Sequence, residues 1–164
     1  MLIHEPYRQS LDMYRAMVEA QRAGLIRAIG VSNFKQGFYE KFIAECEVIP
    51  AVNQFEAHVF YCPTALKDCM ERHGTIFQAW SPLTEGHRDI VGNPTLRSIG
   101  QKHGKTAAQA ALRFLTQQGI PIAPKSARRE RMIENMSIED FELDGEDLSA
   151  IKKLDEGRSL FGWY

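Results

Sequence analysis

The sequence lacks the features that would place it at a membrane or on a nucleic acid. None of its apolar runs approaches the length of about 20 residues that spans a bilayer. The first residues, Met-Leu-Ile-His-Glu-Pro, have neither the basic region nor the apolar core of a secretion signal. The formal net charge of -1 is not the basic excess of a nucleic-acid binder. We therefore expect a protein that contacts neither membranes nor nucleic acids.

Cysteine is scarce, and several catalytic motifs are missing. The three cysteines, Cys46, Cys62 and Cys69, are odd in number and have no CxxC spacing, which favours reduced thiols and a cytoplasmic location. The histidines show no HExxH or paired His/Cys spacing, so no metal site is expected. The sequence also has no GxSxG elbow and no P-loop. These absences disfavour zinc enzymes, α/β-hydrolases and P-loop NTPases.

Short apolar segments alternate with amphipathic ones along the chain. The length of 164 residues suits one core, and we expect a single domain over residues 1–164. Five strands are predicted, at residues 2–4, 26–31, 51–54, 75–79 and 120–123. Seven helices are predicted, at residues 10–25, 36–47, 63–74, 93–104, 106–119, 129–135 and 144–154. Ser10 is expected to cap the first helix, and Phe38, Phe42 and Ile43 to be the buried face of the second.

This alternation predicts an α/β protein with a parallel sheet. Two architectures fit five parallel strands: a small doubly wound sheet, or part of a (β/α)₈ barrel. The pattern alone does not separate them. A doubly wound nucleotide-binding fold would carry a Gly-rich turn after its first strand, and this sequence has none.

Two segments far apart in the sequence carry polar groups at predicted strand ends. The first is Arg27–Phe34, a strand that ends in Ser32 and Asn33. The second begins Ile122-Ala123-Pro124-Lys125-Ser126 and continues through Arg131, Glu134 and Asn135. Ligands of parallel α/β proteins bind at the carboxyl ends of the strands. Together the segments predict a site for a polar, phosphate-bearing ligand.

Both segments closely resemble the cofactor-binding motifs of the aldo-keto reductases, and the resemblance runs from Leu2 to the C-terminus. It implies the barrel architecture. Because an intact barrel needs about 250 residues, this chain would supply the last five parallel strands with their helices and lack the first three βα units. A truncated gene, a misassigned start codon and a cleaved product would all give such a chain.

The resemblance also implies a role for each matching residue. His4 would be the catalytic histidine that polarises the substrate carbonyl, and the cofactor would be NADPH. The implied cofactor contacts are Ser32, Asn33 and Gln54 on the nicotinamide carboxamide, Trp80 stacked on its ring, Ser81 and Leu83 along the pyrophosphate, Lys125, Ser126 and Arg131 on the ribose 2′-phosphate, and Glu134 and Asn135 on the adenine.

Each of these residues also has an ordinary structural interpretation. His4 is a polar residue leaving a strand, and Ser32 and Asn33 are typical of helix caps and local turns. A lone tryptophan such as Trp80 is usually part of a core, and Lys125–Arg131 has the composition of an ordinary solvated basic turn. The Pro-Lys-Ser entry after the strand and the following Glu134-Asn135 are nevertheless a distinctive combination.

The resemblance implies an NADPH-dependent oxidoreductase that reduces aldehydes or ketones to alcohols. The Asp, Tyr and Lys that the family uses for proton transfer come from the part before His4, so the isolated chain is expected to be inactive. Two alternatives stay open: a non-catalytic nucleotide-binding or structural remnant, and a subunit that completes a barrel with another chain. Open sheet edges would favour self-association in both cases. The last residues, including Trp163 and Tyr164, would either line the substrate pocket or cover the core.

Overall fold

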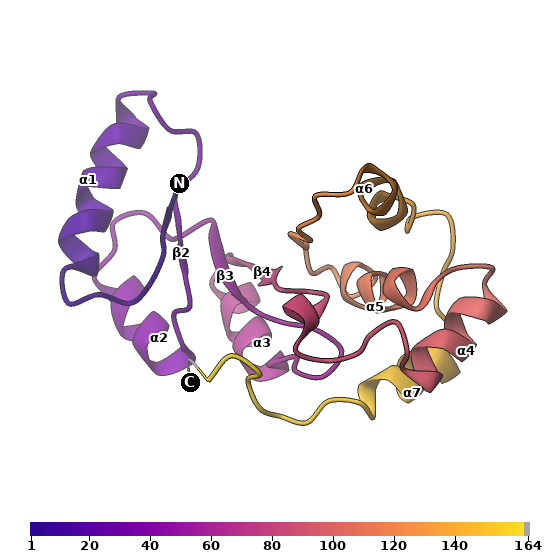
Figure 1. The fold of residues 1–164 in the computed structure, drawn as a ribbon. Helices are drawn as coiled ribbons and strands as arrows, with labels where there is room; N and C mark the ends of the chain where they lie inside the picture. The colour runs from indigo at the N-terminus through magenta and orange to yellow at the C-terminus, as the bar shows by residue number, and fades with distance from the viewer. Residues whose placement is uncertain (163–164) are drawn as a thin grey trace. The chain divides into compact units, whose positions relative to one another are not determined.

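The computed structural model describes residues 1–162. Strands and helices alternate as far as residue 80, and the named elements after it are helical (Figure 1). The strands are β1 (Leu2–Ile3), β2 (Gly30–Ser32), β3 (Val52–Glu56) and β4 (Ile76–Trp80). The helices are α1 (Ser10–Arg22), α2 (Gln36–Ala44), α3 (Thr64–Arg72), α4 (Pro94–Lys102), α5 (Ala107–Thr116), α6 (Arg129–Met136) and α7 (Gly145–Lys152), with a short 3₁₀ turn η1 (Thr84–Gly86). Trp163 and Tyr164, and the expectation for them, lie outside the described residues.

The chain divides into two compact units. The first comprises residues 1–55 and 63–78, and the second comprises residues 56–62 and those from 79 onward. The strands form a four-stranded sheet in the order β1-β2-β3-β4, and the predicted parallel α/β class is confirmed. Leu2 pairs with Gly30 in the first ladder, and Ser32 pairs with Gln54 in the second. Strands β3 and β4 each begin in the first unit and end in the second.

The fifth predicted strand, at residues 120–123, is reduced to a single parallel bridge between Ala79 and Ile122. The amide of Ala79 donates to the carbonyl of Pro121 (2.8 Å), and the amide of Ala123 donates to the carbonyl of Ala79 (3.2 Å). Pro121 has no N–H, and Pro124 follows two residues after the bridge, so the segment cannot extend a regular ladder. The expected strand position is right, but the structure has four strands and a bridge within residues 1–162.

Helix ends follow local capping chemistry. Asn93 accepts from the amide of Leu96 at the start of α4, while Thr106 and Asp144 form capping boxes before α5 and α7. The expected cap at Ser10 is wrong: α1 begins with Ser10 itself after Gln9, which makes no side-chain cap bond.

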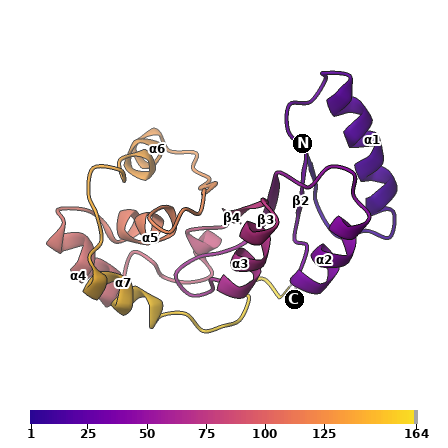
Figure 2. The same ribbon diagram turned by 180° about the vertical axis from the view of Figure 1, so that it is seen from behind.

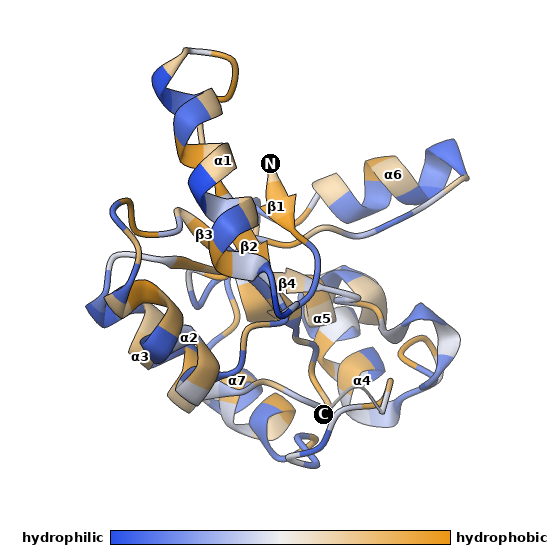
Figure 3. Cartoon of the chain, turned by 90° about the vertical axis from the view of Figure 1, so that its left-hand side faces the viewer, coloured by the Kyte–Doolittle hydropathy of each residue, from blue (hydrophilic) through white to orange (hydrophobic). Residues whose placement is uncertain are grey.

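The core of the first unit is built on aromatic contacts between α1, α2 and Phe34, which lies two residues after β2. The ring of Phe42 packs edge-on against Tyr14 (5.2 Å between centroids) and Phe34 (5.0 Å). Phe42 and Ile43 are buried as expected, but Phe38 is 42% exposed, so the expectation for it is wrong. The Phe38 ring lies at the edge of this cluster, against the rings of Phe34 and Phe42. Figures 2 and 3 show the same helices from other sides.

The second unit is held together by α4, α5 and α7. Helix α5 buries Ala110, Ala111 and Phe114, as its sequence pattern predicts. Lys102 of α4 bonds to Asp144 and Asp147, and the bond to Lys102 is the main reason that the pKa of Asp144 falls to about 2. None of the helices within residues 1–162 is both long and apolar enough to cross a bilayer.

Gly30 of β2 lies against the backbone of Val52 in β3 and the side chain of Leu2 in β1. A Cβ at this position would lie 2.4 Å from the carbonyl oxygen of Val52 and 2.8 Å from Cδ2 of Leu2. We expect Gly30→Ala to lower the free energy of unfolding by about 1–3 kcal/mol, because the sheet must open to admit the methyl group. Urea unfolding followed by circular dichroism measures this. Gly37→Ala in α2 is the matched control, since its Cβ would meet nothing within 4 Å. An equal loss in both variants would contradict the steric explanation.

Candidate functional site

The residues predicted to form the site fall into two groups, one in each unit. His4, Ser32, Asn33 and Gln54 belong to the first unit and lie at or next to the ends of β1, β2 and β3. The second unit holds Trp80, Ser81, Leu83, Lys125, Ser126, Arg131, Glu134 and Asn135. Parallel strands place their carboxyl ends at one edge of a sheet, which brings the first group together.

Asn33 joins the ends of three strands. Its side-chain amide Nδ2 donates to the carbonyl of His4 (3.2 Å) and to the Glu5 carboxylate (2.8 Å), and its backbone amide donates to the carbonyl of Gln54 (2.9 Å). Only 3% of Asn33 is exposed, and its φ is 63°. Asn tolerates this left-handed conformation better than most residues. The side chain of Asn33 therefore links strand ends, and the N-cap of α2 is Lys35 instead of Asn33.

Ser32 and Gln54 are linked in the same way. The Ser32 hydroxyl donates to the Gln54 carbonyl (2.9 Å), and Nε2 of Gln54 donates to Oε1 of Gln78 on β4 (2.8 Å). Oε1 of Gln54 accepts no hydrogen bond from residues 1–162 and is available to a ligand donor. Since these bonds fix both side chains, the strand ends present a rigid polar edge next to the exposed His4.

Backbone strain is concentrated at predicted site residues. Four non-glycine residues of the described chain have positive φ: Asn33 (63°), Ser81 (53°), Thr84 (61°) and Glu85 (50°). Two of them are site residues, and the other two follow Leu83 directly. Such conformations cost roughly 1–3 kcal/mol each and gather at ligand sites. The strain therefore marks residues 81–85 as a candidate binding segment independently of any motif.

Trp80 ends β4, and the strained segment follows it. The Trp80 ring is half-buried and packs against Phe161, with centroids 5.0 Å apart and planes at 63°. The hydroxyl Oγ of Ser81 is buried and has no hydrogen-bond partner within residues 1–162. Leu83 is half-buried directly before η1. A buried hydroxyl without a partner is unusual in a native structure and is a place where a ligand oxygen or a water can bind.

Lys125 and Ser126 lie in the loop that leads from the Ile122 bridge to α6. The Ser126 hydroxyl accepts from the backbone amide of Arg128 (3.1 Å), which turns the chain into the helix. Arg128 is the N-cap of α6 and makes no side-chain cap bond, so the first amides of α6 are not capped by a side chain. Arg131 lies in the first turn of α6, whose residues are hydrophilic in Figure 3.

Lys125 and Arg131 of this loop form no ion pair with the part of the chain that the structure describes. Both residues are exposed. Two unpaired cations beside an uncapped helix N-terminus are an arrangement suited to a phosphate dianion. The loop fits the predicted phosphate site.

Glu134 and Asn135 follow on α6 and are both half-buried. The Glu134 carboxylate accepts from the Thr106 hydroxyl (2.6 Å), and the Glu134 carbonyl accepts from Gln109 (3.1 Å). These bonds hold α6 to the start of α5. The structure therefore gives Glu134 a structural role, and its contact with adenine stays a prediction.

Sequence reasoning missed several polar residues around the site. Gln78 could have been found from the sequence, because it lies two residues before Trp80 on β4 and its side chain is therefore on the same side of the strand. Glu56 at the end of β3 and Thr84 gave no motif signal. No three His, Cys, Asp or Glu side chains gather as a metal site in the part of the chain that is described.

Comparison with known proteins identifies the family. The sequence model of the aldo/keto reductase family matches residues 1–156. The chain belongs to the aldo/keto reductase family. It is 40% identical to the glyoxal reductase of Bacillus subtilis over 156 residues, which cover 94% of this chain and 56% of that protein.

Solved structures share the fold. One, an enzyme from a Medee basin deep-sea metagenome library, has a TM-score of 0.92 at 34% identity over 96% of this chain and 60% of its own. A mutant of Gox0644, solved in complex with NADPH, has a TM-score of 0.90 at 34% identity over 96% of this chain and 59% of its own. This aldo-keto reductase chain thus spans a little over half the length of the relatives it matches.

Proposed function

We propose that the chain is the C-terminal portion of an NADPH-dependent aldo-keto reductase that reduces aldehydes or ketones to alcohols. In this proposal, residues 1–164 form one domain with the last strands of a partial (β/α)₈ barrel and work in the cytoplasm. The observation that carries it is the loop around Lys125, Ser126 and Arg131. Its unpaired cations and uncapped helix N-terminus match a 2′-phosphate, the group that distinguishes NADPH from NADH.

The other residues fit the rest of the cofactor. The unpartnered Ser81 hydroxyl lies in the strained segment proposed for the pyrophosphate, with Leu83 beside it. Oε1 of Gln54 can accept from a carboxamide N–H, and Ser32 and Asn33 belong to the same hydrogen-bonded edge. Trp80 offers an aromatic face for the nicotinamide ring. Glu134 and Asn135 would contact the adenine.

The proposed mechanism divides the work among these residues. A bound NADPH would supply the hydride. Ser32, Asn33 and Gln54 would fix the rotation of the nicotinamide through its carboxamide, which selects the ring face turned toward the substrate. The imidazole of His4 would donate to the carbonyl oxygen and polarise the C=O bond. Protonation of the developing alkoxide is assigned to a tyrosine of the preceding barrel units, tuned by an Asp and a Lys.

We expect a longer protein that includes these units to oxidise NADPH when given a small aldehyde. Glyoxal is the first substrate to test, because the glyoxal reductase is a 40% identical relative. The decrease in absorbance at 340 nm measures the rate, with NADH as the control cofactor. His4→Ala should lower kcat by about 10²-fold or more, since a polarising donor is lost. A longer protein that reduces no aldehyde or ketone with NADPH would reject this function.

A second candidate is a non-catalytic chain that binds nucleotide or associates with another chain. It is favoured by one observation: β1 lies at an edge of the sheet, with backbone groups available for pairing. Such a chain would reduce no carbonyl substrate. Size-exclusion chromatography with light scattering would then detect oligomers of the chain.

A further inference from the structure

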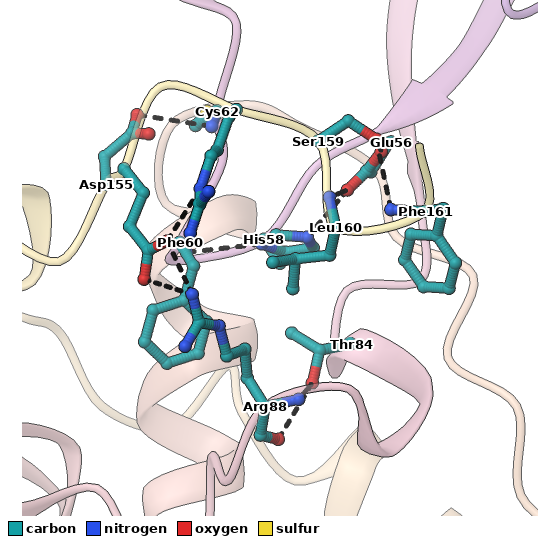
Figure 4. A network of polar contacts seen from close by, with 12 residues as sticks. Glu56, His58, Phe60, Cys62, Thr84, Arg88, Asp155, Ser159, Leu160 and Phe161 are labelled. Atoms are coloured by element: carbon teal, nitrogen blue, oxygen red, sulfur yellow. Dashed lines mark hydrogen bonds and ion pairs between the residues drawn. The ribbon is translucent and has the colours of Figure 1, made fainter. Parts of the chain in front are cut away.

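A carboxylate outside the proposed cofactor contacts is buried at the centre of a polar network in the second unit. Glu56, the last residue of β3, has a fully buried side chain. Its oxygens accept from Nε2 of His58 (3.1 Å), from the backbone amide of Leu160 (2.8 Å) and from the hydroxyl of Ser159 (Figure 4). Two of these three donors come from a segment about a hundred residues away in the sequence.

The electrostatics show how much the carboxylate depends on those donors. Burial raises the pKa of Glu56, but the hydrogen bonds from His58, Ser159 and Leu160 outweigh it, so the pKa lies below its usual range. The carboxylate is therefore an anion inside the protein. A buried anion that loses its donors is strongly unfavourable. Glu56 and the segment that carries Ser159 and Leu160 consequently hold each other in place.

The same segment is fastened at further points. We call residues Asp155–Phe161 the C-terminal strap. Asp155 accepts from the amide of Cys62 (3.3 Å), and the amide of Glu156 donates to the carbonyl of Phe60 (2.9 Å). The guanidinium of Arg88 binds both oxygens of Glu156 (2.6 and 2.5 Å). The strap is thus bound along residues 56–62 and to the segment after η1.

The strap ends on Trp80. The amide of Phe161 donates to the Ser159 hydroxyl (3.2 Å), which itself donates to Glu56. This fixes the Phe161 ring between Trp80, 5.0 Å away, and His87, 4.6 Å away between centroids. A continuous chain of contacts therefore runs from the Glu56 carboxylate through Ser159 to the aromatic ring that faces Trp80.

We propose that Glu56 is a positioning residue that fixes the Trp80 ring through the C-terminal strap and Phe161. The inference rests on the proposed function, in which Trp80 supports the nicotinamide. A Trp80 ring held in one orientation has less freedom to lose when a second ring stacks on it, so the strap prepares the nicotinamide end of the site. The phosphate loop of Lys125 and Arg131 is not part of this network.

The test measures binding of the whole cofactor and of its adenosine end separately. Glu56→Gln is made in a Trp163→Phe background, so that Trp80 is the remaining tryptophan of the chain. In this variant we expect the fluorescence emission of Trp80 to change in the absence of ligand. We also expect about three- to tenfold weaker NADPH binding, because the Trp80 ring must become ordered when the cofactor binds. Adenosine 2′,5′-bisphosphate, which lacks the nicotinamide, should bind with unchanged affinity.

Two further variants distinguish a specific effect on Trp80 from misfolding of the Glu56→Gln protein. Phe161→Leu keeps the anchors and removes the ring, and it should reproduce the loss for NADPH alone. Arg158→Gln is the matched control on the strap, because its side chain is 74% exposed and its ion pair within residues 1–162 is with Glu156. It should leave both affinities and the emission unchanged.

The outcomes are distinct. Unchanged Trp80 emission in Glu56→Gln and Phe161→Leu, or tighter NADPH binding in either, would overturn the positioning role. Equal losses for NADPH and the bisphosphate would show a general structural role instead and would also overturn it. A parent chain that binds neither ligand would refute the proposed function, while the emission would still decide whether the strap fixes Trp80.

Discussion

The 164-residue chain is expected to oxidise NADPH with glyoxal at least about 100-fold more slowly than a longer chain that carries the Asp, Tyr and Lys motifs of the family upstream of His4. A positioned general acid contributes roughly 10²–10⁴ in rate. In the proposed mechanism His4 polarises the carbonyl but is not assigned the proton that the alkoxide needs. In the proposed barrel, the units before His4 would also exclude water, which otherwise weakens the electrostatics of the site.

Two tyrosines of the described chain are too deeply buried to donate a proton to a substrate. Tyr14 and Tyr39 are at most 1% exposed, and the Tyr39 hydroxyl is bound to Thr75 (2.6 Å). Burial raises the pKa of Tyr39, which makes it a poorer acid. Tyr7, three residues after His4, is 43% exposed and is the one to test.

The assay compares three proteins under identical conditions: the 164-residue chain, its Tyr7→Phe variant and the longer chain. Circular dichroism and NADPH titration verify that each is folded and binds cofactor. Turnover by the short chain within about tenfold of the longer one would refute the assignment of proton transfer to the preceding units. Loss of that turnover in Tyr7→Phe would then identify Tyr7 as the donor.

Arg131→Ala is expected to weaken NADPH binding by about 1.5–3 kcal/mol and to leave NADH binding almost unchanged. The estimate is the usual contribution of a hydrogen bond to a charged group. Arg131 lies in the first turn of α6 and forms no salt bridge within residues 1–162, so its charge is available to the 2′-phosphate that NADH lacks.

The matched control for this change is Arg129→Ala. Arg129 is exposed in the same turn of α6, and no site role is assigned to it. Titrations of both variants with both cofactors, followed by tryptophan fluorescence, separate a specific contact from the general field of a basic turn. Equal weakening of NADPH binding in the two variants would favour the solvated basic turn over a phosphate site. Equal losses for NADPH and NADH in Arg131→Ala would remove its assignment to the 2′-phosphate.

The sequence predicted what local chemistry determines. Helix starts at Asn93, Thr106 and Asp144 were readable because each supplies the oxygen that an unpaired helical amide needs. The parallel α/β class was readable from the alternation of strands and helices. The ends of β1 and β2 were readable because apolar runs stop at His4 and Ser32.

The errors have tertiary causes. Phe38 has the spacing of a core residue, but its ring lies against Phe34 and Phe42 beside an open pocket that α1 also lines, and 42% of Phe38 is exposed. Pro121 has no N–H to donate to a neighbouring strand, so the predicted strand is reduced to a bridge. Which strand is the neighbour follows from the tertiary structure. The Glu56 network joins residues 103 and 104 positions apart, and no spacing rule could reveal it.

Equilibrium titration of the unmodified chain decides whether it contains an NADPH site. NADPH, NADH and adenosine 2′,5′-bisphosphate are titrated by calorimetry at one salt concentration, with 5′-AMP as the control ligand that lacks the 2′-phosphate. We expect NADPH to bind at least about tenfold more tightly than NADH, since the 2′-phosphate adds charged hydrogen bonds. We also expect the bisphosphate to bind while 5′-AMP does not bind measurably. No binding of NADPH, NADH or the bisphosphate, or equal affinity for NADPH and NADH, would contradict the proposed NADPH site.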